Sequence, residues 1–464
     1  MDGFQRELLA RMPLGSAALD LFAYVLDERF LNGVFEAHRG LCYERELSFA
    51  KLVYLIRDAL VCHGGSAQAS FERADEQDEL PVAATNAYGK LSRTPLAVSM
   101  APLSDGAHRL AGLLPEGLAC PLPASLAAFT CVAIDGKKLK NAAKRLKPLR
   151  GQPGKLLGAK LLVALDVGSG LAVAMNVDLD GERNDVPLVS GLLPQVRSKL
   201  HGLILWVADS QFCDLTLPGL FEQEGGHFLL RYTKKLSFHP DPSRPAKEGV
   251  DARGRRFVEE WGWVGSIKDK RRRYVRRITL YRPGEEDVAV ITDLLDETLY
   301  PAVDLLEMYL MRWGIERVFQ QVTEVFELQR LIGSSPQAGA FQAALCLLLY
   351  DMIQVCKAYA AQAAERKVEE VSGEKLFEDM RHELIAWAKV GDPAYRAALA
   401  PPTAGQLRST LAERIGGAWT KRWVKKVNKN PRPPTRRTKQ SGAHTSVWRV
   451  LQAHRGGGQK AVRS

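Results

Sequence analysis

The sequence has few cysteines, and no two of them form a Cys-x-x-Cys pair. Seven are scattered through the 464 residues, at positions 42, 62, 120, 131, 213, 346 and 356. An odd, scattered set supports neither a disulfide framework nor a structural zinc site, and it fits a reducing cytoplasm. The nine histidines show no metal-ligand spacing either, so core, surface or tail positions account for them.

Long hydrophobic runs are also missing. The amino terminus carries Asp2 and Glu7 and has no apolar run of signal-peptide length. Residues 331–350 contain no charge, but Gly333 and Pro336 interrupt them. We therefore expect a turn followed by a buried helix in this region, and no membrane span.

Acidic residues are absent from the end of the chain. Residues 421–464 contain thirteen Lys or Arg and no Asp or Glu, so their formal charge is +13. Because the net charge of the whole chain is +11, residues 1–420 together carry −2. Together with a pI near 9.2, this basic arm predicts a polyanionic partner. Its composition predicts a tail that is disordered without DNA, although Trp423 and Trp448 suggest that it docks on DNA or on the protein.

A length of 464 residues exceeds one hydrophobic core and predicts several structural units. Residues 1–115 are expected to be helical, with Phe49, Leu52, Val53 and Ile56 at helical spacing. A DNA-binding unit and a helical cap fit this pattern equally well. The other predicted units are a first part of an α/β core at 116–232, an inserted β subdomain at 233–299, a second part of the core at 300–360, a helical C-terminal region at 361–420 and the basic tail at 421–464.

The segment 129–140 has the sequence F-T-C-V-A-I-D-G-K-K-L-K. Its apolar part predicts a buried strand that ends at Asp135, where side chains become available for chemistry. The carboxylate is either paired for charge with Lys137, Lys138 and Lys140, or it holds a cation among groups that bind phosphates. Taken alone, the segment favours the ion pair.

A second carboxylate follows another predicted strand. Residues 161–167 and 171–177 are apolar runs joined by Gly-Ser-Gly, which predicts a β-hairpin. Residues 203–208 (L-I-L-W-V-A) predict a further buried strand that ends at Asp209. Both acids are therefore expected in one mixed sheet. The 107 residues from Asp209 to Glu316 are too many for one loop and predict the inserted β subdomain.

The third acid lies on a helix that we predict at 301–327. At about 100° per residue, Tyr309, Arg312, Glu316 and Thr323 share one face, and apolar side chains occupy an arc about 130° away. A solvated helix face would look similar. Trp313, beside this face, is expected in the core rather than as a platform for base stacking.

Three carboxylates, two after strands and one on a helix, suit a pair of hard divalent cations. Arg312 is suited to a bidentate phosphate contact and Tyr309 to a hydrogen bond to phosphate, with an ion pair to Glu316 and simple packing as the alternatives. Residues 137–160 hold nine Lys or Arg and no acid, which is typical of a track for a nucleic-acid backbone. The further candidate DNA contacts are Lys137, Lys138 and Arg231.

The three motifs together resemble the DDE transposases of bacterial insertion sequences, of the insertion sequence family four type with a β insertion before the Glu. They are V-A-I-D-G around Asp135, V-A-D-S around Asp209 and Y-L-M-R-W-G-I-E at 309–316; G-E-R-N-D at 181–185 is also similar. The resemblance covers about residues 129–335. It implies an RNase H-like catalytic core with an inserted β subdomain, flanked by helical N- and C-terminal regions.

The resemblance also implies cut-and-paste DNA transposition, with hydrolytic nicking at transposon ends and transfer of the 3′ hydroxyls into target DNA. It assigns catalysis and metal ligation to Asp135, Asp209 and Glu316, with two Mg²⁺ ions that Mn²⁺ can replace, and phosphate contact to Tyr309 and Arg312. The implied partners are double-stranded DNA, both terminal inverted repeats and target, and a second copy of the chain in the DNA complex. The implied location is the bacterial cytoplasm, with the nucleoid.

Two departures from the family pattern qualify these expectations. The family signature continues with a Lys seven positions after the Glu, where this chain has Thr323, and residues 287–291 contain no Trp that could hold a flipped base. The alternative function is a decayed or domesticated protein that binds transposon ends without cutting. A carboxylate-pair glycosidase would leave the basic stretch unexplained. The other acids nearby are expected in strand or turn roles: Asp166, Asp178, Asp180 and Asp185.

Overall fold

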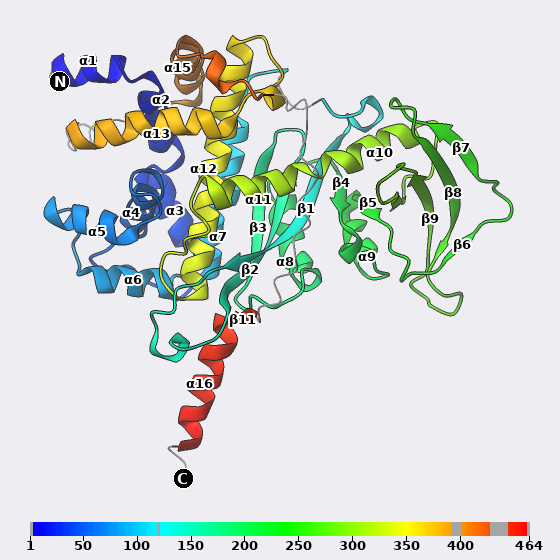
Figure 1. Ribbon diagram of the computed structural model, residues 1–464, viewed down its shortest axis with the longest axis horizontal. Helices are drawn as coiled ribbons and strands as arrows, with labels where there is room; N and C mark the ends of the chain where they lie inside the picture. The colour runs from blue at the N-terminus through cyan, green and yellow to red at the C-terminus, as the bar shows by residue number, and fades with distance from the viewer. Residues whose placement is uncertain (1–2, 118–120, 391–400, 427–443, 462–464) are drawn as a thin grey trace.

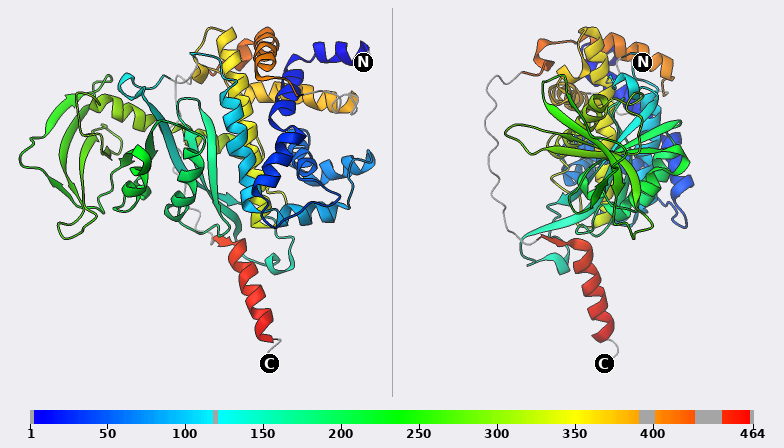
Figure 2. Two further views of the ribbon diagram at one scale, coloured as in Figure 1. Left: turned by 180° about the vertical axis from the view of Figure 1, so that it is seen from behind. Right: turned by 90° about the vertical axis from the view of Figure 1, so that its right-hand side faces the viewer.

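The computed structural model describes residues 3–117, 121–390, 401–426 and 444–461 (Figure 1). A central sheet separates two unlike parts of the molecule. The N-terminal helices gather on one side of the sheet, and the strands of the insertion extend from the other side (Figures 1 and 2). Within the described residues the sheet contains eleven strands.

Five strands form the part of the sheet that carries the two aspartates. β1 (Phe129–Lys140), β2 (Lys155–Asp166) and β3 (Leu171–Asp178) are antiparallel neighbours. β4 (Leu203–Ala208) pairs with β1 in parallel, and β5 (His227–Arg231) pairs with β4 in parallel. The predicted hairpin, the predicted strand before Asp209 and the mixed sheet are confirmed.

Continuous apolar runs explain these strands, because a strand covered on both faces has no polar side to show. Residues 156–165 of β2 are buried without interruption, and Trp206 in β4 is fully buried. Gly170, with a positive φ, closes the turn between β2 and β3, where a residue with a side chain would be strained.

The insertion adds antiparallel strands to the same sheet. β10 (Val288–Thr292) pairs with β5, β9 (Arg273–Leu280) with β10, and β8 (Arg256–Val264) with β9. β6 (Phe238–Pro240) and β7 (Lys247–Val250) both pair with β8. The insertion therefore continues the sheet of the core, and its last strand returns the chain to the edge of β5.

Helices cover both faces of the core strands. α11 (Gly314–Glu324) packs on the face of β1 that carries Asp135, and α8 (Val189–Arg197) packs on β2 and β3 from the opposite face. α7 (Leu96–Ala111) and α12 (Pro336–Ala363) pack on β3 and on each other. α12 is long and apolar enough to cross a membrane, but its apolar segment is wholly buried inside the protein, as the sequence predicted.

The two terminal regions form one helical block. α13 (Gly373–Val390) and α15 (Ala404–Gly417) both pack on α2 (Pro13–Val25). Other helices in the described part of the chain are α1 (Gly3–Ala10), α3 (Glu28–His38), α4 (Phe49–Val61), α5 (Ala67–Glu76), α6 (Ala84–Arg93) and α9 (Leu217–Phe221).

The prediction of one helix at 301–327 is wrong, because the helix is broken. α10 (Ala302–Met311) ends before Arg312, and α11 begins at Gly314. The backbone N–H groups of Arg312 and Trp313 donate to the residues three positions earlier, at 3.2 and 3.3 Å, which is the tighter 3₁₀ pattern. An added Cβ at Gly314 would make only an ordinary van der Waals contact with Leu165, at 3.5 Å, so the break does not depend on the missing side chain.

We expected the basic tail to be disordered without DNA, but the part of the tail that the structure describes contains a strand and a helix. Residues 427–443 lie outside the described residues. β11 (His444–Ser446) pairs in parallel with the first residues of β2, where β3 has ended, and α16 (Val447–Ala461) follows. Trp423 docks on the protein, with its Nε1 donating to Asp379 at 2.7 Å. The open edge of β2 is the physical reason for order at 444–446, because it offers unpaired backbone groups.

A buried ion pair lies behind β1, on the face opposite to Asp135. Lys160 pairs with Asp185, and their side chains are only 7% and 5% exposed. Asp185 also lies directly against Gly136, where any added Cβ would collide with its carboxylate. The charge of either partner would therefore be buried without compensation if the other were removed.

Replacing Lys160 with methionine should test this pair. Lys160→Met leaves Asp185 buried and unpaired, so we expect a loss of about 3–5 kcal/mol in the free energy of unfolding, measured by urea denaturation. The double variant Lys160→Met/Asp185→Asn, which carries no charge at either position, should be more stable than the single variant. A single variant as stable as the parent would contradict the pair.

Candidate active site

Strand register places the first two acids side by side. Ile134 of β1 is opposite Ala208 of β4, and Ala208 is opposite Leu230 of β5. The residues that directly follow these three along the chain are Asp135, Asp209 and Arg231. These three side chains therefore lie in one row across the sheet.

The prediction that Asp135 ends its strand is wrong. β1 continues to Lys140 and stays paired with β2, with Asp135 opposite Val163. β4 ends at Ala208, so the neighbour of Asp135 on that side is the start of a turn. Asp209 caps this turn by accepting a hydrogen bond from the N–H of Ser210.

The break between α10 and α11 brings the third acid and a guanidinium to this row. Arg312 Nη1 lies 3.8 Å from Asp135 Oδ2, and Arg312 Nη2 lies 3.3 Å from Glu316 Oε1. The Arg312 side chain is 4% exposed, whereas that of Glu316 is 44% exposed. Arg312 thus bridges a buried acid and an acid that faces solvent.

The electrostatics of these groups are coupled. Burial raises the pKa of Asp135 to about 6; the Gly136 N–H and Arg312 oppose this shift, and Asp209 and Glu316 add to it. Burial alone would lower the pKa of Arg312, but Tyr309 and the three acids together raise it. Each of the three carboxylates therefore acts on Arg312, as expected for side chains that share one small region.

Tyr309 lies beneath this group. It is 2% exposed, and the Arg312 guanidinium lies 5.6 Å from the centre of its ring. Burial raises the pKa of its hydroxyl, so the hydroxyl is neutral and able to donate a hydrogen bond at neutral pH. Packing and hydrogen bonding are both available to this residue.

The residue types fit a divalent cation, since Asp135, Asp209 and Glu316 supply only oxygen donors. Among the described residues, however, no three acidic, His or Cys side chains are close enough together to hold a metal as they stand. Arg312 contacts two of the acids, and its Nε and Nη1 are buried without a hydrogen-bond partner in the described part of the chain. Arg312 therefore neutralises the acids in this arrangement.

The remaining candidate DNA contacts fall in different places. Arg231 lies in the row of acids and pairs at 3.0 Å with Glu286, which is 82% exposed. Lys137 shares the face of Asp135, because side chains alternate along a strand, and its Nζ donates to the Phe319 carbonyl of α11 at 3.2 Å. Lys138 is exposed on the opposite face, so it does not belong to this cluster.

The four other acids have structural partners. Asp185 pairs with Lys160, and Asp180 accepts from Arg449 at 2.8 Å. Asp166 accepts from the N–H of Gly168 within the β2–β3 turn, and Asp178 from that of Asp180. Sequence reasoning placed all four in strand or turn roles but missed that Asp185 supports Gly136, the residue after Asp135. The G-E-R-N-D segment was the available signal.

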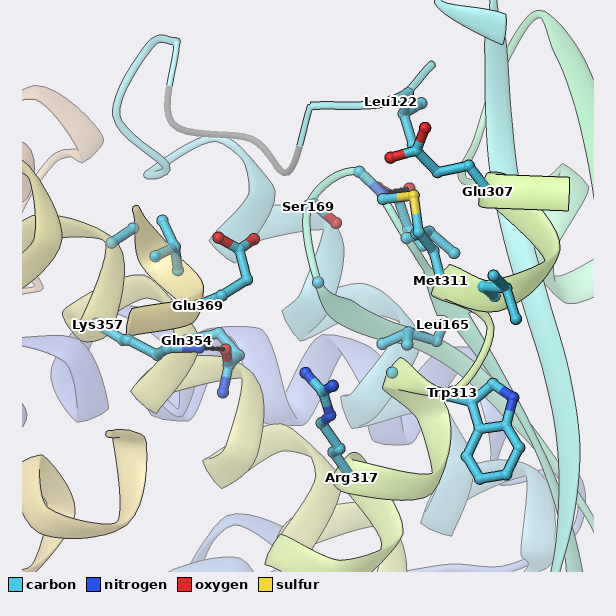
Figure 3. A pocket seen from close by; sticks show the side chains of 18 of the residues that line it. Leu122, Leu165, Ser169, Glu307, Met311, Trp313, Arg317, Gln354, Lys357 and Glu369 are labelled. Carbon is cyan, nitrogen blue, oxygen red and sulfur yellow. Dashed lines mark hydrogen bonds between the residues drawn. The ribbon is translucent and has the colours of Figure 1, made fainter. Parts of the chain in front are cut away.

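A cavity of about 790 Å³ lies beside these residues and not at the acids. The β2–β3 turn, α10–α11 and α12 line it, and Figure 3 shows Met311, Trp313, Arg317 and Gln354 around it. Trp313 is 49% exposed, so its predicted core position is wrong. It stands in the turn between the end of α10 and the start of α11, beside the face of Tyr309, Arg312 and Glu316.

Comparison with known proteins supports the motif analysis. Residues 128–352 match the family model described as "Transposase DDE domain", a span that includes all three acids. With the mixed sheet, this match confirms the predicted RNase H-like core within an α/β fold. The insertion sequence family four subtype stays a prediction.

One similar solved structure is the cryo-EM structure of the piggyBac transposase synaptic complex with hairpin DNA. The similarity covers 91% of this chain and 88% of that chain, with 12% sequence identity and a TM-score of 0.40. No curated protein matches the chain.

Divalent ions should stabilise the protein through these acids. Added Mg²⁺ or Mn²⁺ should raise the melting temperature of the parent, because a ligand that binds only the folded state at about 100 times its Kd contributes about 2.7 kcal/mol. Asp135→Asn and Asp209→Asn should each remove most of this shift. Asp178→Asn, an acid at the end of β3, is the matched control and should keep it. Equal shifts in all four proteins would contradict a metal site here.

Proposed function

We propose, on the premise that residues 128–352 belong to the transposase DDE domain family, that the chain catalyses cut-and-paste DNA transposition by phosphoryl transfer. The reaction would nick DNA hydrolytically at transposon ends and then join the 3′ hydroxyls to target DNA. The observation that carries this proposal is the meeting of Asp135, Asp209, Glu316 and Arg312 at one sheet edge.

We assign two Mg²⁺ ions to Asp135, Asp209 and Glu316, with Mn²⁺ able to replace them. Bound there, such ions would stabilise the attacking and leaving oxygens of an in-line displacement. The protein fixes the first of these ligands: the Asp135 side chain is 17% exposed, and its backbone is held between β2 and Asp185. Glu316, on a helix terminus and half exposed, is the ligand with most freedom to move.

Arg312 and Tyr309 are suited to hold the phosphate. A guanidinium presents its N–H groups in a fixed fork that matches phosphate oxygens. Two nitrogens of Arg312 are buried and have no hydrogen-bond partner within the described residues. Such groups are costly to leave unpaired, and a phosphate at the acids would satisfy them. The neutral Tyr309 hydroxyl would donate to the same group.

The partner we propose is double-stranded DNA, both the terminal inverted repeats and the target. Arg231 would contact its backbone from the row of acids, since the ion pair with the exposed Glu286 is of the weak surface kind. A second copy of the chain would join the DNA complex, because two transposon ends must be processed together. The proposed location is the bacterial cytoplasm, with the nucleoid.

Nicking of DNA tests the proposal directly. The substrate is a duplex made from the DNA that borders this reading frame, where inverted repeats are expected. The parent should nick it only with Mg²⁺ or Mn²⁺, and Asp135→Asn should reduce the rate by at least about 100-fold, as losses of charge-stabilising groups do. The same variant should bind the duplex as tightly as the parent. A parent that binds this duplex and never nicks it would contradict catalysis.

That last outcome defines the second candidate, a protein that binds transposon ends without cutting. Thr323 favours it, because the family signature has a Lys at this position. The structure offers a replacement for that charge, however. Thr323 Oγ1 donates to the Phe319 carbonyl at 2.5 Å, and Lys137 Nζ from β1 donates to the same carbonyl at 3.2 Å. A cation is thus present where the signature lysine would start.

Lys137 and Thr323 can therefore be tested as a pair. Lys137→Ala should weaken binding of the end-containing duplex about tenfold, as expected for one charged hydrogen bond. Lys137→Ala/Thr323→Lys should recover it, because the lysine returns from the neighbouring element. Lys138→Ala, which removes the same charge from the other face, is the control for binding near the acids. Failure of the double variant to regain affinity would show that the two positions are not equivalent.

A further inference from the structure

We propose that the C-terminal unit β11–α16 and the β1–β2 connection together form a second contact surface for duplex DNA, away from the acids. We define this distal surface as residues 140–155 and 444–455. The proposal rests on the proposed function for the position of the DNA at Asp135. It goes further by giving the basic tail a folded, DNA-facing role.

The charge of the distal surface is largely uncompensated. Of the nine Lys or Arg in residues 137–160, only Lys160 has a carboxylate partner among the described residues. Lys144 and Arg150 instead donate to backbone carbonyls, of Gln152 and of Arg145. Such bonds fix the side chains and leave their positive charge available to an anion. The exposed cations of the connection are Lys144, Arg145, Lys147 and Arg150.

The tail is attached to this connection by packing as well as by strand pairing. Val447 is fully buried in a small cluster with Ala142, Leu149 and Leu156, separate from the main core. All three partners belong to the connection or the start of β2. The tail and the connection therefore form one unit, and displacing the tail would expose this cluster.

An ionic clamp fixes the first turn of α16. Arg449 Nε donates to Asp180 at 2.8 Å, and Arg449 also pairs with Glu182. Glu182 in turn accepts from the N–H of Ser446 at 2.8 Å. These two acids lie just after β3, and both are used for docking. Arg449 is thus an anchor, and the remaining cations of the surface stay free.

α16 beyond this clamp projects away from the body of the protein (Figures 1 and 2). It contains no acid, and Trp448, His454 and Arg455 are exposed. A helix that extends into solvent with basic and aromatic side chains has the dimensions to enter a major groove. Because α16 contains no acid, it attracts a negatively charged partner and repels a positively charged one.

The distances suit one continuous duplex. At about 3.3 Å per residue, β1 spans roughly 17 Å from Asp135 to Lys140. At about 1.5 Å per residue, α16 adds roughly 12 Å from Val447 to Arg455. The sum, roughly 30 Å, corresponds to eight or nine base pairs at about 3.4 Å each. DNA cut at Asp135 would therefore reach α16 within about one helical turn.

Salt-dependent binding tests the distal surface without any need for cleavage. The probe is a fluorescent duplex of about 30 base pairs of mixed sequence, followed by anisotropy between about 50 and 200 mM salt without divalent ions. The variant combines Lys144→Ala, Arg145→Ala, Lys147→Ala and Arg150→Ala. Losing four phosphate contacts should lower the salt slope by about 3.6, so the affinity of the parent should fall roughly 150-fold further than that of the variant over this range.

The control variant removes the same charge elsewhere. It combines Arg366→Ala, Lys367→Ala, Lys389→Ala and Arg408→Ala, all exposed in the C-terminal helical region, and it should keep the slope of the parent. A connection variant with the slope of the parent would overturn the proposal, as would tighter binding of single-stranded RNA or anionic vesicles than of the duplex.

The clamp gives an independent test of α16. Arg449→Glu should repel Asp180 and Glu182, release the helix and weaken duplex binding about tenfold. Asp180→Arg/Arg449→Glu restores an opposite-charge pair and should return most of the affinity. Equal affinities of all three proteins would exclude α16 from the surface. A parent that shows the expected salt slope and never nicks DNA would instead count against the proposed function alone, so the two failures are distinguishable.

Discussion

The geometry of the site depends on the register of three parallel strands. β1, β4 and β5 are aligned so that the residues after Ile134, Ala208 and Leu230 stand in one row. A slip of one residue in β4 would turn Asp209 to the other face of the sheet. Backbone hydrogen bonds and buried apolar side chains therefore fix the two aspartates. The acids, which repel each other, contribute nothing to their own placement.

The position of the third acid, Glu316, depends on where the chain returns after the inserted strands. The insertion leaves after β5 and ends with β10, which pairs antiparallel with β5. α10 then runs toward the row from the other end of β1, where Tyr300 contacts Phe129. The break before α11 directs Arg312 onto Asp135 and Glu316. An insertion built as an extension of the sheet keeps its two ends together, so that 107 residues separate the last two acids along the chain without separating them in space.

The sequence predicts those elements that depend on residues close together along the chain. Continuous apolar runs predicted β1, β2 and β4, and the spacing of Tyr309, Arg312 and Glu316 predicted a shared helix face. The break at 312–313 was missed, because the apolar spacing on its two sides fits one continuous helix. The order of the tail was missed for a similar reason: the open edge of β2 is a tertiary feature, invisible in a basic, proline-containing sequence.

Two buried charges on opposite faces of one strand raise a question of stability. The Asp135 side chain lies on one face of β1, and the Lys160–Asp185 pair lies on the other face, against Gly136. The Asp185 carboxylate occupies the place that a side chain at position 136 would take. Apolar residues at 160 and 185 would be as stable or more stable, since desolvation opposes buried ion pairs. A core that accepts this cost next to a half-buried carboxylate breaks the rules of packing where a function requires it. The pair holds the backbone of Asp135 from behind while Arg312 neutralises its side chain from the front, so the position of the carboxylate is set from both faces of the sheet.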